Sequence, residues 1–196
     1  MAAHQQTSHH HRLLVVIGPS GSGKSSVIRE LQRRGVLRVH PTWTDRPSRD
    51  DERSGSAEHR FISDAAFDRL CSQGFFLQTA ALPGLPFRYG LPALHPPVGG
   101  PIDAVILRAP FVDRFAQLFP DQLVYQLEDT AQRARARLLS RGCAPAELAA
   151  RLDDHHTEIA AGRRVAHRVI VNDRPLAALA HTVAAALHTD MTGGLP

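Results

Sequence analysis

The stretch Gly18-Pro19-Ser20-Gly21-Ser22-Gly23-Lys24-Ser25 matches the phosphate-binding pattern G-x-x-x-x-G-K-[ST] at every fixed position. An apolar run of strand length, 13–17, precedes it, and 26–32 reads as a helix after it. Lys24 is also the only lysine in a chain whose lysines and arginines together number 23. Strand, glycine-rich loop and helix in this order predict a site for nucleotide phosphates.

The residue types in this loop suit phosphate chemistry. Glycines allow successive backbone N–H groups to turn toward one centre, and the following helix points its positive N-terminal end at the same place. The hydroxyl of Ser25 can bind Mg²⁺. Lys24 supplies a compact, mobile charge that can follow a phosphoryl group, whereas an arginine would present a broad rigid fork.

Length and composition favour one intracellular domain. A chain of 196 residues is long enough to bury a core, and no apolar stretch approaches the roughly 20 residues of a membrane span. The polar start of the sequence lacks the apolar centre of a signal peptide, so we expect a cytoplasmic protein without membrane contact. Cys71 and Cys143 have neither disulfide-framework nor zinc-site spacing and are interpreted as packing residues.

The charge pattern favours a small anionic partner. The net charge is +4, but the arginines are dispersed, and no aromatic-spaced basic stretch or lysine-rich tail accompanies them. We therefore expect no nucleic-acid binding. The histidine tract 9–11 could bind a metal ion, but its place in a terminal segment favours an incidental tract.

Strand-like and helix-like segments alternate along the rest of the chain. A polar segment, 41–57, is too long for a simple connector and is predicted to be a functional loop. The alternation predicts an α/β fold with a parallel sheet covered by helices on both faces. The predicted strands are 36–40, 75–80, 104–107, 123–127 and 168–171, and 87–89 is a short extended piece. The predicted helices are 64–73 with Asp64 as N-cap, 112–118, 130–141, 145–161 and 175–188.

The segment after the second strand narrows the class of P-loop protein. It reads Thr42-Trp43-Thr44-Asp45-Arg46-Pro47-Ser48-Arg49-Asp50-Asp51-Glu52, and Glu58-His59-Arg60-Phe61 follows. The chain resembles the guanylate kinase family, whose P-loop reads GPSGSGKS and whose acceptor segment runs T-T-R-x-P-R-x-G-E and then D-Y-x-F. Further matches, in the family's order over nearly the whole chain, are Tyr89-Gly90, Arg137–Gly142, Arg151-Leu152 with Glu158, and Val171-Asn172-Asp173.

The resemblance implies a P-loop NTPase fold and an organisation around ATP, Mg²⁺ and a nucleoside monophosphate, with GMP as the default acceptor. It places a kinase domain at 12–188, with an acceptor-binding insertion at about 41–100 and a lid at about 133–160. The terminal segments 1–11 and 189–196 are expected to be disordered tails. We expect a monomer or a homodimer.

The resemblance also assigns roles residue by residue. Lys24, Arg46, Arg141 and Arg151 are the expected catalytic cations, the last two from the lid. The residues expected to hold ATP are Gly18, Ser20, Gly21, Ser22, Gly23, Lys24, Ser25, Ser26 and Asn172, with Ser25 as the metal ligand and Asn172 beside adenine. The residues expected to bind the acceptor are Thr42, Arg46, Arg49, His59, Gln78, Tyr89 and Arg108.

Three positions depart from the family's guanine-reading set. Gln78 stands where the family has a glutamate, Leu91 where it has Thr or Ser, and Arg108, by an ungapped count, where it has an aspartate. A carboxylate accepts from both N1–H and N2–H of guanine, whereas an amide offers one acceptor and one donor. Arg108 would suit an acceptor that carries a second anionic group. His59 also replaces a phosphate-binding tyrosine.

Two alternative functions stay open at this level. Ribose 1,5-bisphosphate phosphokinases share the P-loop and an ending like Tyr89-Gly90-Leu91-Pro92, and their acceptor has no base. Some guanylate kinase-like domains are binding modules that do not catalyse, but those typically lose the P-loop lysine. Because Lys24 and the arginines persist here, we expect an enzyme, with the guanylate kinase type ahead.

Overall fold

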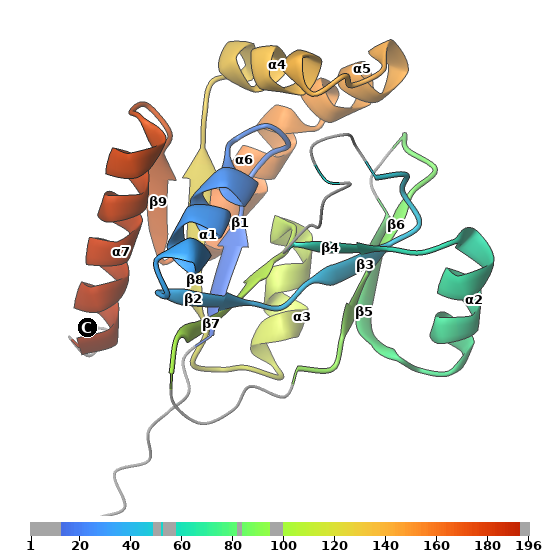
Figure 1. Ribbon diagram of the computed structural model, residues 1–196, viewed down its shortest axis with the longest axis horizontal. Coiled ribbons are helices and arrows are strands. Elements are labelled where there is room, and N and C mark those ends of the chain that lie inside the picture. The colour runs from blue at the N-terminus through green and yellow to red at the C-terminus, as the bar shows by residue number, and fades with distance from the viewer. Residues whose placement is uncertain (1–12, 49–51, 53–57, 82–83, 95–99, 193–196) are drawn as a thin grey trace, which may run out of the picture.

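The computed structural model describes residues 13–48, 52, 58–81, 84–94 and 100–192 (Figure 1). The predicted tail 1–11 and the segment 193–196 lie outside the described residues. The other predicted tail is wrong in part, because the last helix, α7 (Leu176–Thr192), continues through 189–192. Its Leu, Ala and Val residues keep packing on the sheet up to Leu187, and the added turn packs Met191 on the same cluster.

The predicted parallel sheet is confirmed, with strand order β2-β7-β1-β8-β9 and parallel pairing throughout. Its strands, in chain order, are β1 (Leu14–Ile17), β2 (Leu37–Val39), β7 (Ile102–Ile106), β8 (Leu123–Glu128) and β9 (Arg168–Val171). Adjacent residues of β1 point to opposite faces, so a strand buried on both faces must be apolar throughout. That requirement explains the uninterrupted apolar sequence of β1, which is buried at all four positions.

Helices cover both faces of this sheet (Figure 1). On one face, Leu14 and Val16 pack against α1 (Lys24–Arg33) and α7. On the other face, Val15 and Ile17 share a core with α3 (Val112–Ala116), the short 3₁₀ helix η2 (Ala109–Phe111) and part of α6 (His155–Val165). The phosphate loop therefore leaves the sheet from a strand that is buried at every position.

A second, mixed sheet of four strands in the order β4-β3-β6-β5 forms the insertion. Its strands are β3 (Thr42–Thr44), β4 (His59–Phe61), β5 (Phe76–Ala81) and β6 (Arg88–Pro92), and α2 (Asp64–Ser72) packs at its end. The prediction of a loop throughout 41–57 is wrong at β3. The Arg, Asp and Ser residues around β3 make the segment polar on average. The strand itself consists of β-branched and aromatic residues, Thr42-Trp43-Thr44, which favour a strand.

The lid consists of α4 (Ala131–Ser140), α5 (Pro145–Asp153) and the start of α6 (Figure 1). The prediction of one helix over 145–161 is wrong, because the chain changes direction at Asp154, which ends α5 and begins α6. The predicted N-cap of α2 is also corrected. Ser63, not Asp64, has the extended backbone of an N-cap, and its hydroxyl accepts from Ala66 N.

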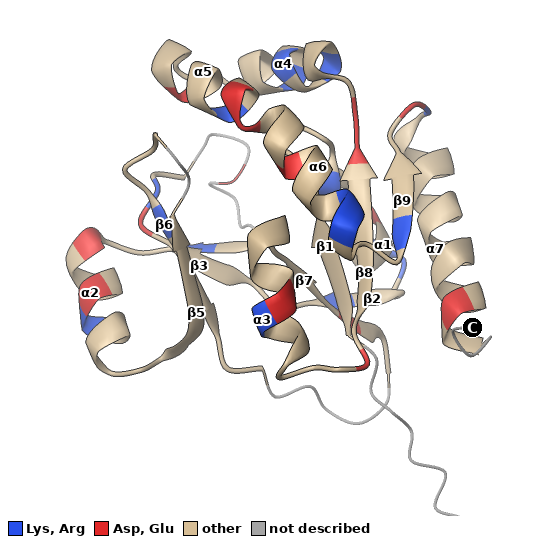
Figure 2. Cartoon of the chain, turned by 180° about the vertical axis from the view of Figure 1, so that it is seen from behind, with Lys and Arg blue, Asp and Glu red and all other residues tan. Residues whose placement is uncertain are grey.

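Charged residues of both signs occur on each of α2, α3, α5 and α6 (Figure 2). This dispersal agrees with the sequence pattern. Within the described ranges, no helix combines the length and the apolar character that crossing a bilayer requires.

Candidate active site

The phosphate loop connects β1 to α1 in a conformation that only glycine allows. Gly18 has φ +132°, and a Cβ there would lie 2.2 Å from the Leu127 carbonyl oxygen. Gly23 has φ +99° at the N-cap of α1 and offers no side-chain cap. The first N–H groups of α1 therefore have no side-chain partner at the cap, which is the condition for binding an anion at a helix N-terminus.

Lys24 lies on the loop that precedes it. Its Nζ donates to the carbonyl oxygens of Gly18 at 2.6 Å and Pro19 at 2.8 Å. Burial lowers the pKa of Lys24 from 10.5 to about 8, although Glu158 and Glu58 act in the opposite direction. Phosphate oxygens would compensate this desolvation, so the ammonium gains most when the loop holds an anion.

One cavity brings together most residues that the sequence singled out. It lies between the phosphate loop, the insertion and the lid, and also contains Glu58, Thr79 and Glu158. The predicted site residues that line it are Gly18, Ser20, Gly21, Lys24, Ser25, Thr42, Arg46, His59, Gln78, Tyr89, Arg108, Arg141 and Arg151.

Four predicted residues do not line this cavity: Ser22, Gly23, Ser26 and Asn172. Asn172 supports the loop, because its Nδ2 donates to the Ser22 carbonyl oxygen at 2.8 Å, and its place beside adenine stays a prediction. Arg49, the other predicted acceptor arginine, lies outside the described residues.

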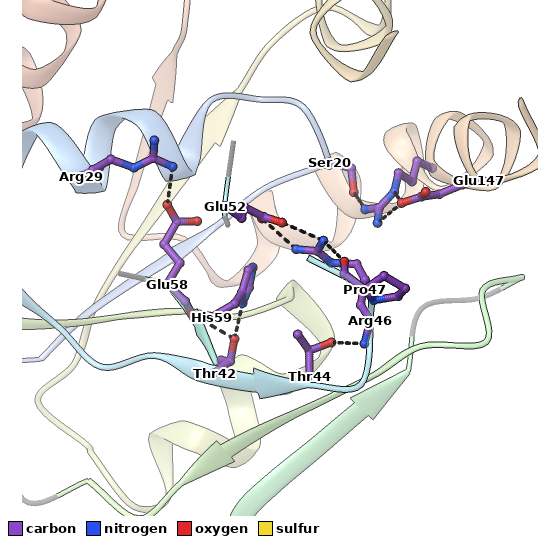
Figure 3. Close-up of polar contacts among 11 residues, drawn as sticks. Ser20, Arg29, Thr42, Thr44, Arg46, Pro47, Glu52, Glu58, His59 and Glu147 are labelled. Atoms are coloured by element: carbon purple, nitrogen blue, oxygen red, sulfur yellow. Dashed lines mark hydrogen bonds and ion pairs between the residues drawn. The ribbon is translucent and has the colours of Figure 1, made fainter. Parts of the chain in front are cut away.

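The insertion contributes a cluster of polar groups to the cavity (Figure 3). Thr42 Oγ1 lies 2.8 Å from His59 Nδ1, and the His59 ring lies beside that of Tyr89 with centroids 5.7 Å apart. Arg46 is almost fully buried, and its two terminal nitrogens donate to the two carboxylate oxygens of Glu52 at 2.8 Å each. This bidentate pair orients the guanidinium plane.

The lid contributes two arginines to the same cavity. Arg151 is held by Glu147 on its own helix, and its Nη1 donates to Ser20 Oγ in the phosphate loop at 3.0 Å. Arg141 follows α4, and its side chain makes no hydrogen bond or ion pair with any residue in the described part of the chain. A charge in that state can bind a phosphate without first breaking an internal contact.

The three positions expected to read the base, Gln78, Leu91 and Arg108, also line the cavity. Gln78 is 8% exposed and its amide has no hydrogen-bond partner within the described ranges, while Leu91 is buried beside it in the strand pairing of β5 and β6. Arg108 was expected to suit a second anionic group on the acceptor, but it already pairs with carboxylates of this chain. Its guanidinium donates to Glu158 at 2.7 and 3.1 Å and also contacts Asp154, so two carboxylates offset its charge.

Two functional candidates escaped sequence reasoning. Arg137 Nε donates to the Gly21 carbonyl oxygen at 2.7 Å, and its guanidinium also contacts Asp129, so α4 is tied to the phosphate loop. Glu58 is 5% exposed, lines the cavity near Ser25 and lies 3.6 Å from Arg29. Burial raises the pKa of the Glu58 carboxyl, and an interaction with the Ser25 hydroxyl partly offsets that rise. The sequence contained one signal for Glu58, because it begins the segment Glu58-His59-Arg60-Phe61 that matches the family's D-Y-x-F.

The donor set next to the loop fits a magnesium ion. Ser25 and Glu58 present a hydroxyl and a carboxylate, the hard oxygen ligands that Mg²⁺ takes, and both line the cavity. Among the described residues, no group of three or more His, Cys, Asp or Glu side chains could hold a metal by itself. Two protein oxygens suit Mg²⁺ bound together with phosphates and waters rather than in a closed protein cage.

The parallel sheet, the loop after β1 and the cavity between loop and lid define a P-loop NTPase fold with a nucleotide-binding site. No protein-family model matches the chain. The chain is 36% identical over 163 residues to a guanylate kinase from Thermobifida fusca, covering 76% of this chain and 78% of that protein. It is 32% identical over 187 residues to a guanylate kinase from Nocardia farcinica, covering 91% and 95%.

A solved structure agrees in fold. The crystal structure of guanylate kinase from Anaplasma phagocytophilum superimposes with a TM-score of 0.70 over 93% of this chain and 87% of that one, at 19% identity. With relatives above 30% identity over most of their length, this chain belongs to the guanylate kinase family.

Proposed function

We propose that the protein transfers the γ-phosphate of ATP to GMP, with Mg²⁺ bound to the nucleotide. The observation that carries this proposal is one cavity lined by the phosphate loop, the acceptor residues of the insertion and two lid arginines. The relatives' name, guanylate kinase, supports GMP as the acceptor. The same relatives do not favour a sugar phosphate kinase or a non-catalytic module.

In this proposal the phosphate loop holds the donor. Backbone N–H groups from Ser20 to Ser25 would surround the β-phosphate, and Lys24 would leave the loop carbonyl oxygens to bind the transferring phosphate. Ser25 would hold Mg²⁺, and the charge of that ion would offset the charge of the phosphates. Arg141 and Arg151 stabilise the negative charge that develops on the leaving group.

The insertion holds the acceptor phosphate in line with the donor. Arg46 is preset by Glu52, and its buried Nε has no hydrogen-bond partner in the described part of the chain. A phosphate oxygen would satisfy that donor, and Thr42, His59 and Tyr89 lie close enough to one another to contact the same group. Such pre-positioning is the main catalytic resource in phosphoryl transfer.

A coupled assay of ADP release tests the proposal. The acceptors are GMP, dGMP, AMP, CMP, UMP and ribose 1,5-bisphosphate, each with ATP and Mg²⁺. We expect the highest kcat/KM with GMP or dGMP. A preference for ribose 1,5-bisphosphate would replace GMP as the proposed acceptor. If none of the acceptors in the panel supported ADP release, the kinase assignment would be rejected.

A further inference from the structure

Glu58 is a buried carboxylate at the junction between the donor and acceptor sides of the cavity. It precedes β4, and its side chain extends toward Arg29 of α1 (Figure 3). It interacts with the Ser25 hydroxyl and with the charge of Lys24. On the other side, its backbone oxygen accepts from Thr42 Oγ1 at 3.3 Å. The carboxylate thus lies where phosphates from both substrates would approach.

P-loop enzymes usually complete their magnesium site with an aspartate at the end of a neighbouring strand. Two strands flank β1, namely β7 and β8. The end of β8 carries Glu128 and Asp129, which pair with Arg163 and Arg137 and do not line the cavity. Strand β7 is followed by Leu107 and Arg108. Arg108 is a cation and cannot serve as a metal ligand. The end of β7 therefore does not supply the carboxylate.

Two other carboxylates line the cavity among the described residues, and both are engaged elsewhere. Glu158 accepts from Arg108 with one oxygen and from Ala109 N with the other, and Asp154 contacts Arg108. Glu58 is the lining carboxylate that faces Ser25. A negative charge there would repel both substrates' phosphates unless a cation lay between them.

We propose that Glu58 supplies the protein carboxylate of the Mg²⁺ site, directly or through a metal-bound water, in place of a residue at the end of β7. The proposal deepens the proposed function, because it rests on the same nucleotide site. Mg²⁺ commonly keeps several waters and takes one or two carboxylates together with substrate phosphates, which matches one hydroxyl and one carboxylate.

The test measures how strongly Mg²⁺ improves nucleotide binding. Calorimetric titrations with a non-hydrolysable ATP analogue are run in Mg²⁺ and in EDTA, for the wild type, Glu58→Gln and the control Glu30→Gln. Glu30 lies on the same helix as Ser25 but pairs with Arg33 and Arg34 on the surface. We expect Glu58→Gln to weaken binding about 10- to 100-fold in Mg²⁺ and not in EDTA, and the control to change neither.

Two results would overturn the proposal. An equal loss in Mg²⁺ and in EDTA would assign Glu58 to loop structure, and unchanged binding in both would remove it from the metal site. If circular dichroism shows that Glu58→Gln is unfolded, Glu58→Asp is measured in its place. The shorter side chain should reduce, by several-fold, the gain in nucleotide affinity that Mg²⁺ gives over EDTA. An undiminished benefit in Glu58→Asp would also reject the proposal. Failure of the proposed function looks different, because the wild type itself would then bind no nucleotide or transfer nothing to GMP.

Discussion

Arg108 and Glu158 form an ion pair that joins the end of the central sheet to the lid, with Nη2 and Nε of Arg108 at 2.7 and 3.1 Å from Glu158 Oε2. Glu158 is 2% exposed, and its other oxygen accepts from Ala109 N. Such a buried pair costs desolvation when it forms, but loss of one partner leaves a charge buried alone.

Arg108→Ala is therefore expected to lower the free energy of unfolding by about 3 kcal/mol, measured by urea denaturation. The matched control is Arg33→Ala, which breaks a solvent-exposed pair with Glu30 and should lower the free energy of unfolding far less. Equal small effects of both substitutions would show that the Arg108 pair contributes no more than a surface contact.

Lys24→Met is expected to abolish phosphoryl transfer and leave the fold intact. The backbone of the loop can still surround a phosphate, but the charge that follows the transferring group is gone. Turnover and circular dichroism on the same preparation check this. If the variant kept more than about a tenth of the wild-type rate, the proposed role of Lys24 would be contradicted.

The lowered pKa of Lys24, about 8, predicts a pH effect on stability without nucleotide. Between that value and the ordinary 10.5, the unfolded chain binds more protons at this residue than the folded protein does. The contribution of Lys24 to the free energy of unfolding therefore rises as pH increases through this window. Melting temperatures of wild type and Lys24→Met at pH 7.5 and at pH 10 should show the wild type gaining relative to the variant, within the range over which the fold survives. A constant difference would mean that the pKa is not lowered.

Arg46→Ala is expected to lower kcat/KM for the acceptor by roughly 10- to 150-fold and to affect ATP much less, since each charge-assisted contact contributes about 1.5 to 3 kcal/mol. Arg49→Ala is expected to behave in the same way. The control is Arg60→Ala, whose guanidinium lies over the Trp43 ring and outside the cavity. Equal loss for ATP and acceptor would place Arg46 in the donor site or in the fold.

The base side of the cavity predicts weak reading of the 2-amino group. Gln78 offers one acceptor where a carboxylate would take both N1–H and N2–H. The wild type should therefore separate GMP from IMP, which lacks that amino group, by less than the double variant Gln78→Glu, Leu91→Thr does. A change of Arg108 to Asp is left out of this variant because it would place a third carboxylate beside Glu158 and Asp154. Steady-state kcat/KM for GMP, IMP and AMP decides it, and a wild type already strongly selective for GMP over IMP would refute this reading.

The sequence predicted those features that depend on neighbouring residues. The apolar run of β1, the glycines and Lys24 act within one short segment, so pattern alone located the phosphate loop and the parallel sheet. Strand β3 was missed because its polar neighbours dominate the local composition. The sequence predicts a single helix over 145–161 because both halves favour helix. The change of direction at Asp154 is set by packing across the lid, which the local sequence does not encode.

The partners of Arg108 could not be predicted for a related reason. They lie 46 and 50 residues away, on an element whose start had itself been misplaced. An alignment position therefore gave the charge of the residue but not the charges that surround it. Glu58 shows the converse case, in which a residue without an assigned role gains one from its neighbours in the fold.

The uniqueness of Lys24 makes this chain a natural reporter of its own occupancy. Acylating reagents react with the neutral form of an amine, and a pKa of about 8 leaves roughly a tenth of Lys24 neutral at pH 7, far more than for an ordinary lysine. No second lysine side chain competes for such a reagent. A mass increment on the peptide that contains Lys24, and its suppression by a bound nucleotide, would therefore measure site occupancy without any engineered label.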